Sequence, residues 1–165
     1  MREQQYNSEI REAEPGDVEE LHSLICELAD FENLRDTVAS KPEDIHEALF
    51  SESPRGEALV AEISRDEKMT WTPGAALAGV AFFYPTFSTF TGRPGLWLED
   101  LYVRPEYRHQ GIGKALLAQF LSLARSRGCS RAEWSVLDWN ASALEFYEHL
   151  GARIMHEWCV ARVNL

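Results

Sequence analysis

The sequence lacks several features that whole classes of protein require. Its three cysteines, Cys26, Cys129 and Cys159, are odd in number and not spaced as zinc ligands are, which argues against a disulfide framework. The five histidines are scattered, so we expect no metal. No apolar run approaches the roughly 20 residues needed to cross a bilayer, and the first ten residues contain no apolar stretch typical of a signal peptide. These absences predict a cytoplasmic protein without a membrane segment.

Basic residues are also scarce. There are 16 Lys and Arg against 27 Asp and Glu, a net charge of −11, which argues against nucleic-acid and anionic-lipid partners. The imbalance is uneven: residues 1–68 hold 19 acids and 7 bases, whereas residues 69–165 hold 8 acids and 9 bases. The first part could attract cations and the second could tolerate an anionic ligand, although an ordinary solvated acidic surface explains the same numbers.

The 165 residues, 45% of them hydrophobic, suffice for one domain with its own core. Residues 1–7 are polar, and we expect them to be frayed. Apolar spacing and Gly or Pro punctuation predict the following elements: strands at 8–13, 58–63, 76–84, 96–103, 131–136 and 153–163, and helices at 18–31, 42–50, 112–127 and 141–150. Pro85 is expected to stop the third strand, and residues 64–74 to form a turn or hairpin loop. This order predicts a mixed α/β sheet with helices on its faces and a strand–helix–strand crossover at 96–136.

A glycine-containing loop, Arg108-His109-Gln110-Gly111-Ile112-Gly113-Lys114, follows a predicted strand and opens a helix. Glycines and a helix N-terminus together suit a pyrophosphate. A Walker A loop is excluded, because Arg108 stands where its first glycine is required and Ala115 follows Lys114; the dinucleotide fingerprint is excluded by Leu116. The pattern that remains is Arg/Gln-x-x-Gly-x-Gly, which by itself also fits a tight turn that holds nothing.

The loop does not stand alone. The segment LEDLYVRPEYR (98–108) precedes it, and WNASALEFY (139–147) with LGA (150–152) follows it. This combination resembles the GCN5-related N-acetyltransferase (GNAT) superfamily over residues 8–163, and most of all the spermidine/spermine N-acetyltransferase-like branch. LADFE (28–32) and the predicted hairpin Trp71-Thr72-Pro73 support that branch. The resemblance implies an α/β (α+β) GNAT fold, a mixed and mostly antiparallel central sheet with helices on both faces, in a single domain over 1–165 that forms a homodimer.

The resemblance also implies acetyl-CoA as co-substrate. Leu101 and Val103 would offer backbone groups to the pantetheine arm, with Tyr102 between them. The pyrophosphate would lie on the loop, and a helix N-terminus would approach from the other side. The implied cofactor residues are Leu101, Tyr102, Val103, Arg108, His109, Gln110, Gly111, Ile112, Gly113, Lys114, Asn140, Ala141, Ser142 and Ala143.

The reaction of this family needs a base and an acid. An alkyl amine has a pKa of about 10.4, so at neutral pH it must lose a proton before it attacks, and the departing thiolate must gain one. By resemblance Glu99 is the general base, directly or through water, and an anchor for the cationic amine; Tyr147 is the general acid. Without the motif, Glu99 and Asp100 fit solvated charges and Tyr147 fits a packing residue. Asp100 is expected to be structural, since only one of two neighbours in a strand points into a cleft.

The implied acceptor is a small cationic amine. By resemblance Phe31, Glu32 and Glu99 line its cleft, Glu133, Trp134 and Ser135 lie across from them, and Glu157 or Asp138 binds a distal ammonium. The sequence differs from the animal spermidine/spermine enzymes at Phe31 and at His156-Glu157-Trp158, so a shorter diamine, a lysine-like amino acid or thialysine fits as well as a polyamine. Two alternatives stay open: acetylation of a protein N-terminus or lysine, and a non-catalytic CoA-binding domain.

Overall fold

The computed structural model describes residues 7–64 and 76–164 of the chain. They fall into two compact units, Met1–Trp134 and Ser135–Leu165, which are taken separately below. Most of the predicted hairpin loop, including Trp71-Thr72-Pro73, and residues 1–6 of the predicted frayed start lie outside the described residues. Asn7, expected to be frayed, is the first residue of a strand.

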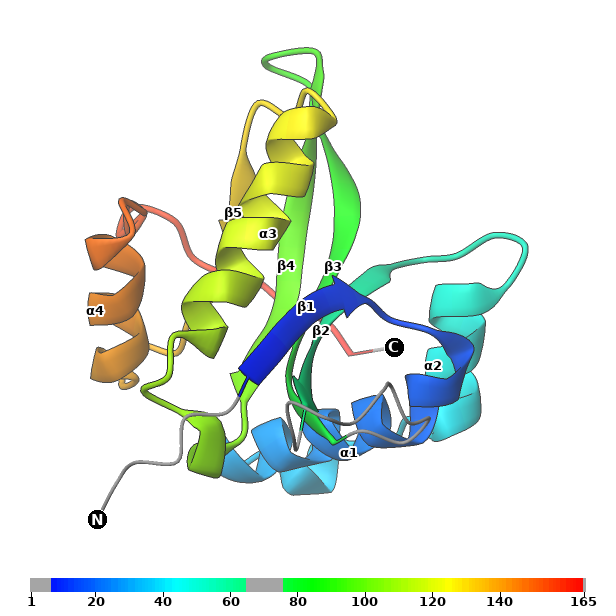
Figure 1. The fold of residues 1–165 in the computed structure, drawn as a ribbon. Helices are drawn as coiled ribbons and strands as arrows, with labels where there is room; N and C mark the ends of the chain where they lie inside the picture. Colours follow the sequence, from blue (N-terminus) through cyan, green and yellow to red (C-terminus); the bar gives the residue numbers. More distant parts are fainter. Residues whose placement is uncertain (1–6, 65–75, 165) are drawn as a thin grey trace. The chain divides into compact units, whose positions relative to one another are not determined.

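The described residues of the first unit form five strands and three α-helices (Figure 1). In chain order they are β1 (Asn7–Glu12), α1 (Val18–Phe31), α2 (Pro42–Phe50), β2 (Glu57–Ser64), β3 (Leu77–Ser88), β4 (Arg93–Val103), α3 (Ile112–Ser126) and β5 (Ala132–Trp134). The sheet order is β1-β2-β3-β4-β5. The pairs β1–β2, β2–β3 and β3–β4 are antiparallel, and the pair β4–β5 is parallel. The predicted crossover is therefore confirmed: α3 connects two parallel strands.

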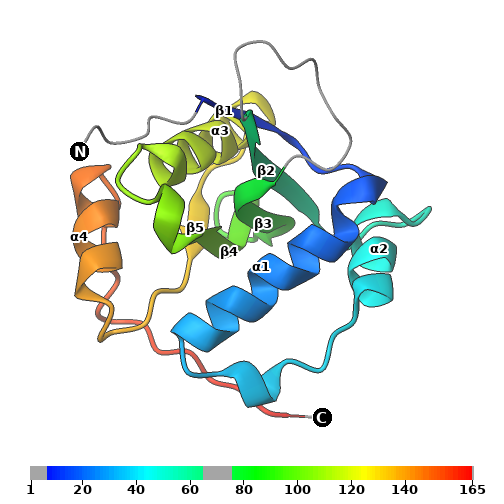
Figure 2. The same ribbon diagram turned by 60° about the horizontal axis from the view of Figure 1, so that its bottom comes forward.

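Side chains of β3 show which helix covers which face of the sheet. Val80 lies in a core cluster with Leu21 and Leu24 of α1. The ring of Phe83 points the other way and packs edge-on against Phe120 of α3, with 5.3 Å between ring centroids. Helices α1 and α2 thus lie on one face of the sheet and α3 on the other, an arrangement that Figure 2 shows from the side of α1.

The expectation that Pro85 stops the third strand is wrong. β3 runs to Ser88 and pairs with β4 throughout, with Pro85 opposite Leu96. Leu96 donates its N–H to Arg131 O, away from β3, so the pair is a non-hydrogen-bonded one in which neither residue needs an N–H toward its partner. The N–H that proline lacks would point to the opposite edge, where the pairing of β2 has ended at Phe83. Proline is tolerated at such an edge position.

The second unit contains helix α4 (Ala141–His149), which ends before Gly151 as predicted. The strand expected at 153–163 is wrong, because residues 152–164 are irregular apart from a turn at His156-Glu157. In that turn Trp158 N donates to Met155 O at 3.2 Å. The turn interrupts the run of apolar residues on which the predicted strand was based. Among the described residues of both units, no helix is long and apolar enough to cross a bilayer.

Candidate active site

A β-bulge in the centre of β4 places two neighbouring carboxylates on one face of the sheet. Phe83 pairs with Leu98 and Phe82 pairs with Asp100, so Glu99 is an extra residue without a partner on β3. Leu98 shares the α3 face with its partner Phe83, whereas Tyr102 belongs to the core cluster under α1. By alternation from Leu98, Glu99 faces α1. The extra residue then reverses the alternation, so Asp100 lies on that same face, together with Tyr102. The expectation that only one of the two carboxylates can point this way is therefore wrong.

These carboxylates influence one another electrostatically. Burial, together with the negative charges of Glu99 and Glu32, raises the pKa of Asp100 from 3.8 to about 6. Burial also raises the pKa of Glu32, which follows the last residue of α1. The structure thus places Glu32 and Glu99, two predicted site residues, each within electrostatic reach of Asp100.

The carboxylate of Glu99 is itself hydrogen-bonded. Trp97 Nε1 donates to Glu99 Oε2 at 3.0 Å. Tyr84 lies directly opposite Trp97 on β3, and burial together with the nearby acceptor and negative charge of Glu99 raises the pKa of its phenol. Glu99 is otherwise exposed to solvent.

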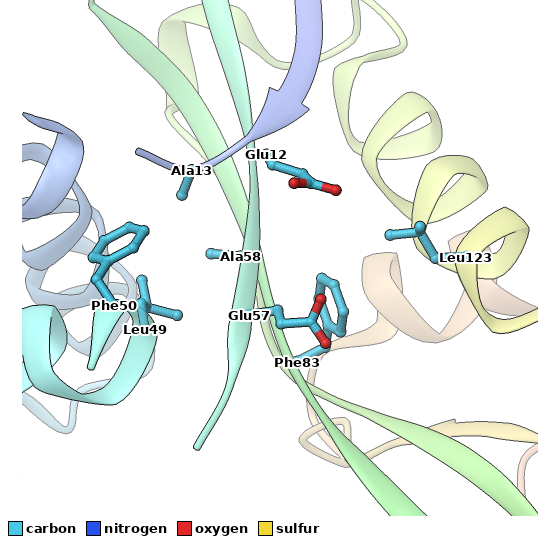
Figure 3. A pocket seen from close by; sticks show the side chains of 8 residues that line it. All are labelled: Glu12, Ala13, Leu49, Phe50, Glu57, Ala58, Phe83 and Leu123. Carbon is cyan, nitrogen blue, oxygen red and sulfur yellow. The ribbon is translucent and has the colours of Figure 1, made fainter. Parts of the chain in front are cut away.

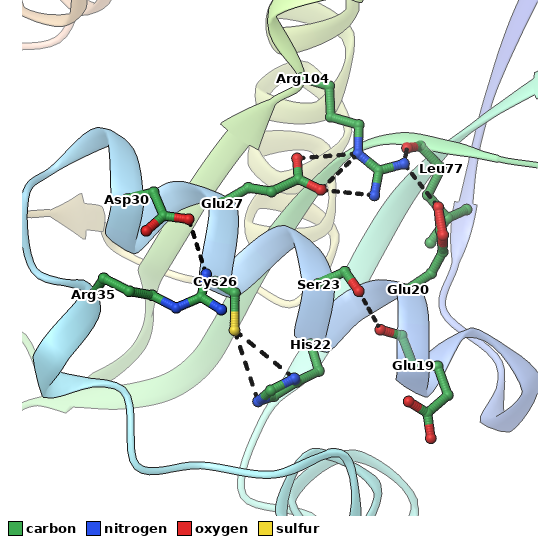
Figure 4. A network of polar contacts seen from close by, with 10 residues as sticks. All are labelled: Glu19, Glu20, His22, Ser23, Cys26, Glu27, Asp30, Arg35, Leu77 and Arg104. Atoms are coloured by element: carbon green, nitrogen blue, oxygen red, sulfur yellow. Dashed lines mark hydrogen bonds and ion pairs between the residues drawn. The ribbon is translucent and has the colours of Figure 1, made fainter.

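An arginine just after β4 ties this strand to α1 (Figure 4). Arg104 donates to both carboxylate oxygens of Glu27, and its Nη1 donates to Glu20 Oε1 at 2.7 Å and to Leu77 O at 2.9 Å. The contacts with the carboxylates of Glu27 and Glu20 are charge-assisted, so they are stronger than neutral hydrogen bonds and also fix the geometry. They hold the strand that carries Glu99 and Asp100 against the helix that leads to Glu32.

Beyond the bulge, some backbone N–H and C=O groups of β4 point away from β3, as binding of an extended ligand requires. Arg104 N donates to Ala78 O on β3. By alternation Tyr102 also faces β3, and Leu101 and Val103 direct their N–H and C=O groups to the opposite side. On that side β5 pairs with β4 only as far as Leu98. The backbone groups predicted to meet pantetheine therefore lie on a stretch that no described strand covers.

The loop after β4 has two residues with positive φ just before the N-terminus of α3. His109 and Gly111 both have positive φ values, 61° and 82°. A left-handed residue directly before a helical one, as Gly111 is before Ile112, is the backbone arrangement of an anion-binding nest. Gly111 is the N-cap of α3 and has no side chain to cap it. Ala115 N is the first to reach a helix carbonyl, that of Gly111, so the preceding N–H groups of the first turn remain available. This geometry fits a pyrophosphate.

Side chains in the loop divide between core and surface. Ile112 is buried and can meet a cofactor only through its backbone, whereas His109, Gln110 and Lys114 are exposed. Arg108 turns back toward the protein: its Nε donates to Val103 O at 2.9 Å. Its guanidinium lies 5.1 Å from the ring centre of Phe31 and 5.6 Å from that of Tyr102.

Helix α4 of the second unit carries the other predicted cofactor residues. Asn140 is its N-cap, and its Oδ1 accepts from Ala143 N at 3.2 Å and from Ser142 Oγ at 3.0 Å. An N-cap that uses its side chain in this way holds the helix start in place. Tyr147 lies two turns along the same helix and is buried, and its ring lies 5.3 Å from that of Phe146.

The remaining predicted residues lie in varied surroundings. Glu133 on β5 forms an ion pair with Arg131 at 2.7 Å, and Trp134 is half-buried. Ser135 opens the second unit, where Glu157 lies 3.6 Å from Arg153. A pocket of about 140 Å³ elsewhere in the first unit is lined by none of the predicted site residues (Figure 3); its lining is Glu12, Ala13, Leu49, Phe50, Glu57, Ala58, Phe83 and Leu123.

Sequence reasoning missed three contributors to the site: the role of Asp100, the hydrogen bond of Trp97 and the place of Tyr84 beside Glu99. One signal for the bulge was present. The apolar positions Leu96 and Leu98 alternate, and the alternation then breaks at the two acids before it resumes.

Comparison with known proteins places the chain in a family. Residues 21–152 match the model of the acetyltransferase (GNAT) family. A thialysine N-epsilon-acetyltransferase of Sus scrofa is 41% identical over 150 residues, which cover 90% of this chain and 85% of that protein. An L-ornithine N5-acetyltransferase of Arabidopsis thaliana is 30% identical over 192 residues, covering 95% and 84% of the two chains.

The fold agrees with this match. A crystal structure of a probable acetyltransferase superposes with a TM-score of 0.74 at 22% identity, covering 95% of this chain and 97% of the other. The predicted mixed, mostly antiparallel GNAT sheet with helices on both faces is confirmed. The family match and the relatives show that the protein is an N-acetyltransferase and that this chain belongs to the acetyltransferase (GNAT) family.

Proposed function

We propose that the protein transfers the acetyl group of acetyl-CoA to a primary amine of a small cationic substrate, a diamine, a polyamine or a lysine- or thialysine-like amino acid. The observation that carries the proposal is the bulge at Glu99. It gathers Glu99 and Asp100 on the face to which Glu32 also contributes charge, next to backbone that β5 leaves uncovered. Relatives named for thialysine and ornithine acetylation support an amine of this size.

The residues of this chain divide the work as follows. The loop from His109 to Lys114 binds the pyrophosphate through main-chain N–H groups, and Leu101 and Val103 align the pantetheine arm. Acetyl-CoA supplies an activated thioester. Carboxylates attract the ammonium group and exclude anions, because their field favours cations over neutral or acidic acceptors.

Proton transfer accompanies acetyl transfer. Glu99 removes a proton from the ammonium group, directly or through water, and the nitrogen then attacks the carbonyl carbon of the thioester. As the carbon–sulfur bond breaks, a proton returns to the sulfur. We assign that proton to Tyr147, on the strength of its place in the family motif. Each transfer is worth about 10²- to 10⁴-fold in rate.

Release of the CoA thiol tests the proposal. Purified protein is incubated with acetyl-CoA and lysine, thialysine, ornithine, putrescine or spermidine, and thiol is followed by a colorimetric reagent. We expect turnover of at least one of these amines and a fall of about 100-fold or more in Glu99→Gln. Glu106→Gln, which removes an exposed carboxylate outside the site, is the matched control and should keep full activity.

Other outcomes would point to other functions. Activity on peptides alone would favour a protein N-acetyltransferase, and acetyl-CoA binding without turnover would favour a non-catalytic CoA-binding domain. A protein that binds no acetyl-CoA would refute the proposal altogether. The homodimer, the cytoplasmic location and a single domain over 1–165 stay predictions; the family match, which spans the boundary between the two units, supports the last of these.

A further inference from the structure

We infer that Trp97 and Tyr84 are positioning residues, which hold the carboxylate of Glu99 in one orientation for the proton transfer assigned to it. The inference rests on the proposed function, since it concerns the base of that reaction. It adds two residues that neither the family motif nor the sequence pattern had singled out.

The contacts come from two adjacent strands. The indole Nε1 of Trp97 donates to Glu99 Oε2 at 3.0 Å, from two residues earlier on β4. Tyr84 is the cross-strand partner of Trp97 on β3, which places its phenol beside Glu99, whose charge and acceptor oxygens raise the phenol's pKa. One carboxylate therefore accepts a hydrogen bond from Trp97 on β4 and has a second donor group, the phenol of Tyr84, beside it on β3.

Glu99 needs such support because of where it lies. It is the extra residue of a bulge, so no residue of β3 pairs with it, and its side chain is exposed. An exposed glutamate populates several rotamers, and fixing it costs conformational entropy that hydrogen bonds must offset. Donors on paired strands, unlike donors on loops, are held at fixed positions before the substrate arrives.

The two donors leave the carboxylate able to act. An ionised carboxylate has about four acceptor sites, so even two hydrogen bonds leave room for the proton of an ammonium group or of a bridging water. Burial and the charge of Glu99 raise the pKa of the Tyr84 phenol, so it remains a neutral donor at neutral pH.

Single and combined substitutions test the role. Tyr84→Phe removes only a hydroxyl group, and Trp97→Phe removes the N–H while keeping an aromatic ring. We expect each to lower kcat by about 10-fold, the value of one hydrogen bond to a charged group, while the KM for acetyl-CoA and the melting temperature stay unchanged. Trp97→His keeps a ring N–H that Trp97→Phe lacks, so its kcat should lie between those of Trp97→Phe and the wild type. Trp158→Phe, at an exposed tryptophan of the second unit, is the matched control and should leave kcat unchanged.

A double-mutant cycle with Glu99→Gln separates positioning from a structural role. If the donors act through Glu99, adding Tyr84→Phe or Trp97→Phe to Glu99→Gln lowers kcat no further. Equal losses in both backgrounds, a raised KM for acetyl-CoA, or a lower melting temperature with unchanged kcat would each overturn the inference.

A spectroscopic arm keeps the inference testable even if no acceptor amine is found. Phenol ionisation is followed by ultraviolet absorbance, and Tyr84→Phe identifies the Tyr84 component. We expect Glu99→Gln to lower the pKa of Tyr84 toward its ordinary value of 10, and Trp97→Phe to leave the Tyr84 component present. A Tyr84 titration that Glu99→Gln does not change would refute the contact, whereas absence of turnover in the wild type with that contact intact would refute the proposed function alone.

Discussion

Replacing Asp100 with asparagine is expected to stabilise the protein at neutral pH. Asp100 is half-buried, and its pKa is raised to about 6 by burial and by the charges of Glu99 and Glu32. At neutral pH the folded protein therefore holds a carboxylate that its surroundings disfavour. Asparagine keeps the shape and removes the charge.

The size of the effect follows from the two pKa values. The unfolded chain loses this proton near pH 3.8, whereas the folded protein keeps it up to about pH 6. Between these values the folded state binds more protons, so this group makes stability fall as the pH rises. Each unit of pKa difference corresponds to 1.36 kcal/mol, so the full cost above about pH 7 is about 3 kcal/mol. Below about pH 3 both states are protonated and the cost disappears.

Urea unfolding followed by tryptophan fluorescence measures the difference. Asp100→Asn and wild type are compared at pH 4 and pH 7.5, so that the titrations of groups that do not interact with Asp100 cancel. We expect the variant to be more stable by about 3 kcal/mol at pH 7.5, and the gap to shrink toward zero at pH 4. Glu106→Gln, at an exposed carboxylate, should differ from wild type by no more than about 0.5 kcal/mol at either pH.

Two results would refute the reasoning. A gap of the same size at both pH values would show that the amide acts through packing or hydrogen bonding, not through charge. A variant less stable than wild type at pH 7.5 would show that the carboxylate is stabilised by its surroundings.

Four further substitutions probe other parts of the structure. Gly111→Ala forces a side chain into positive φ at a cost of about 1–2 kcal/mol, and acetyl-CoA affinity by calorimetry should fall; unchanged affinity would argue against the nest. Arg104→Met removes the hydrogen bonds to Glu27 and should lower the free energy of unfolding by about 2 kcal/mol in urea. A negligible loss would show that the pair is worth no more than a surface contact. Phe120→Ala opens a cavity beneath the sheet and should cost about 4 kcal/mol by the same assay, and a loss below 1 kcal/mol would mean that the core closes around it. Tyr147→Phe should lower kcat more than acetyl-CoA affinity, because its proton is needed only as thiolate charge develops; the reverse pattern in steady-state kinetics would contradict its role as acid.

Features that depend on local spacing were predictable. The apolar repeat of α3 and the glycine after it located that helix to within a residue, because helix formation and capping depend on neighbours three to five residues away. The loop from Arg108 to Lys114 was recognised for the same reason, since its glycines and the helix start are contiguous. The family motif then supplied the chemistry that the loop alone left open.

Features that depend on strand pairing were not predictable. Pro85 predicts a strand end because a strand interior needs a backbone N–H, but β2 has already ended on that side of β3, so no N–H is required there. The composition of residues 153–163 predicts a strand, yet strand formation depends on pairing and packing with neighbours that composition does not reveal. The bulge at Glu99 is a mismatch between two strands, so its effect on Asp100 follows from register and not from the local sequence alone.

The two prolines of the β3–β4 hairpin also bear on the behaviour of the protein at high concentration. Pro94 lies opposite Phe87 and Pro85 opposite Leu96, and Pro85 removes a donor from the side of the ribbon that β2 leaves uncovered. A strand of another molecule that paired with this edge would lack one hydrogen-bond donor at Pro85. Proline at sheet edges is one way in which natural proteins resist edge-to-edge aggregation. Restoring an amide there, as in Pro85→Val, would turn this rim into a template for aggregation.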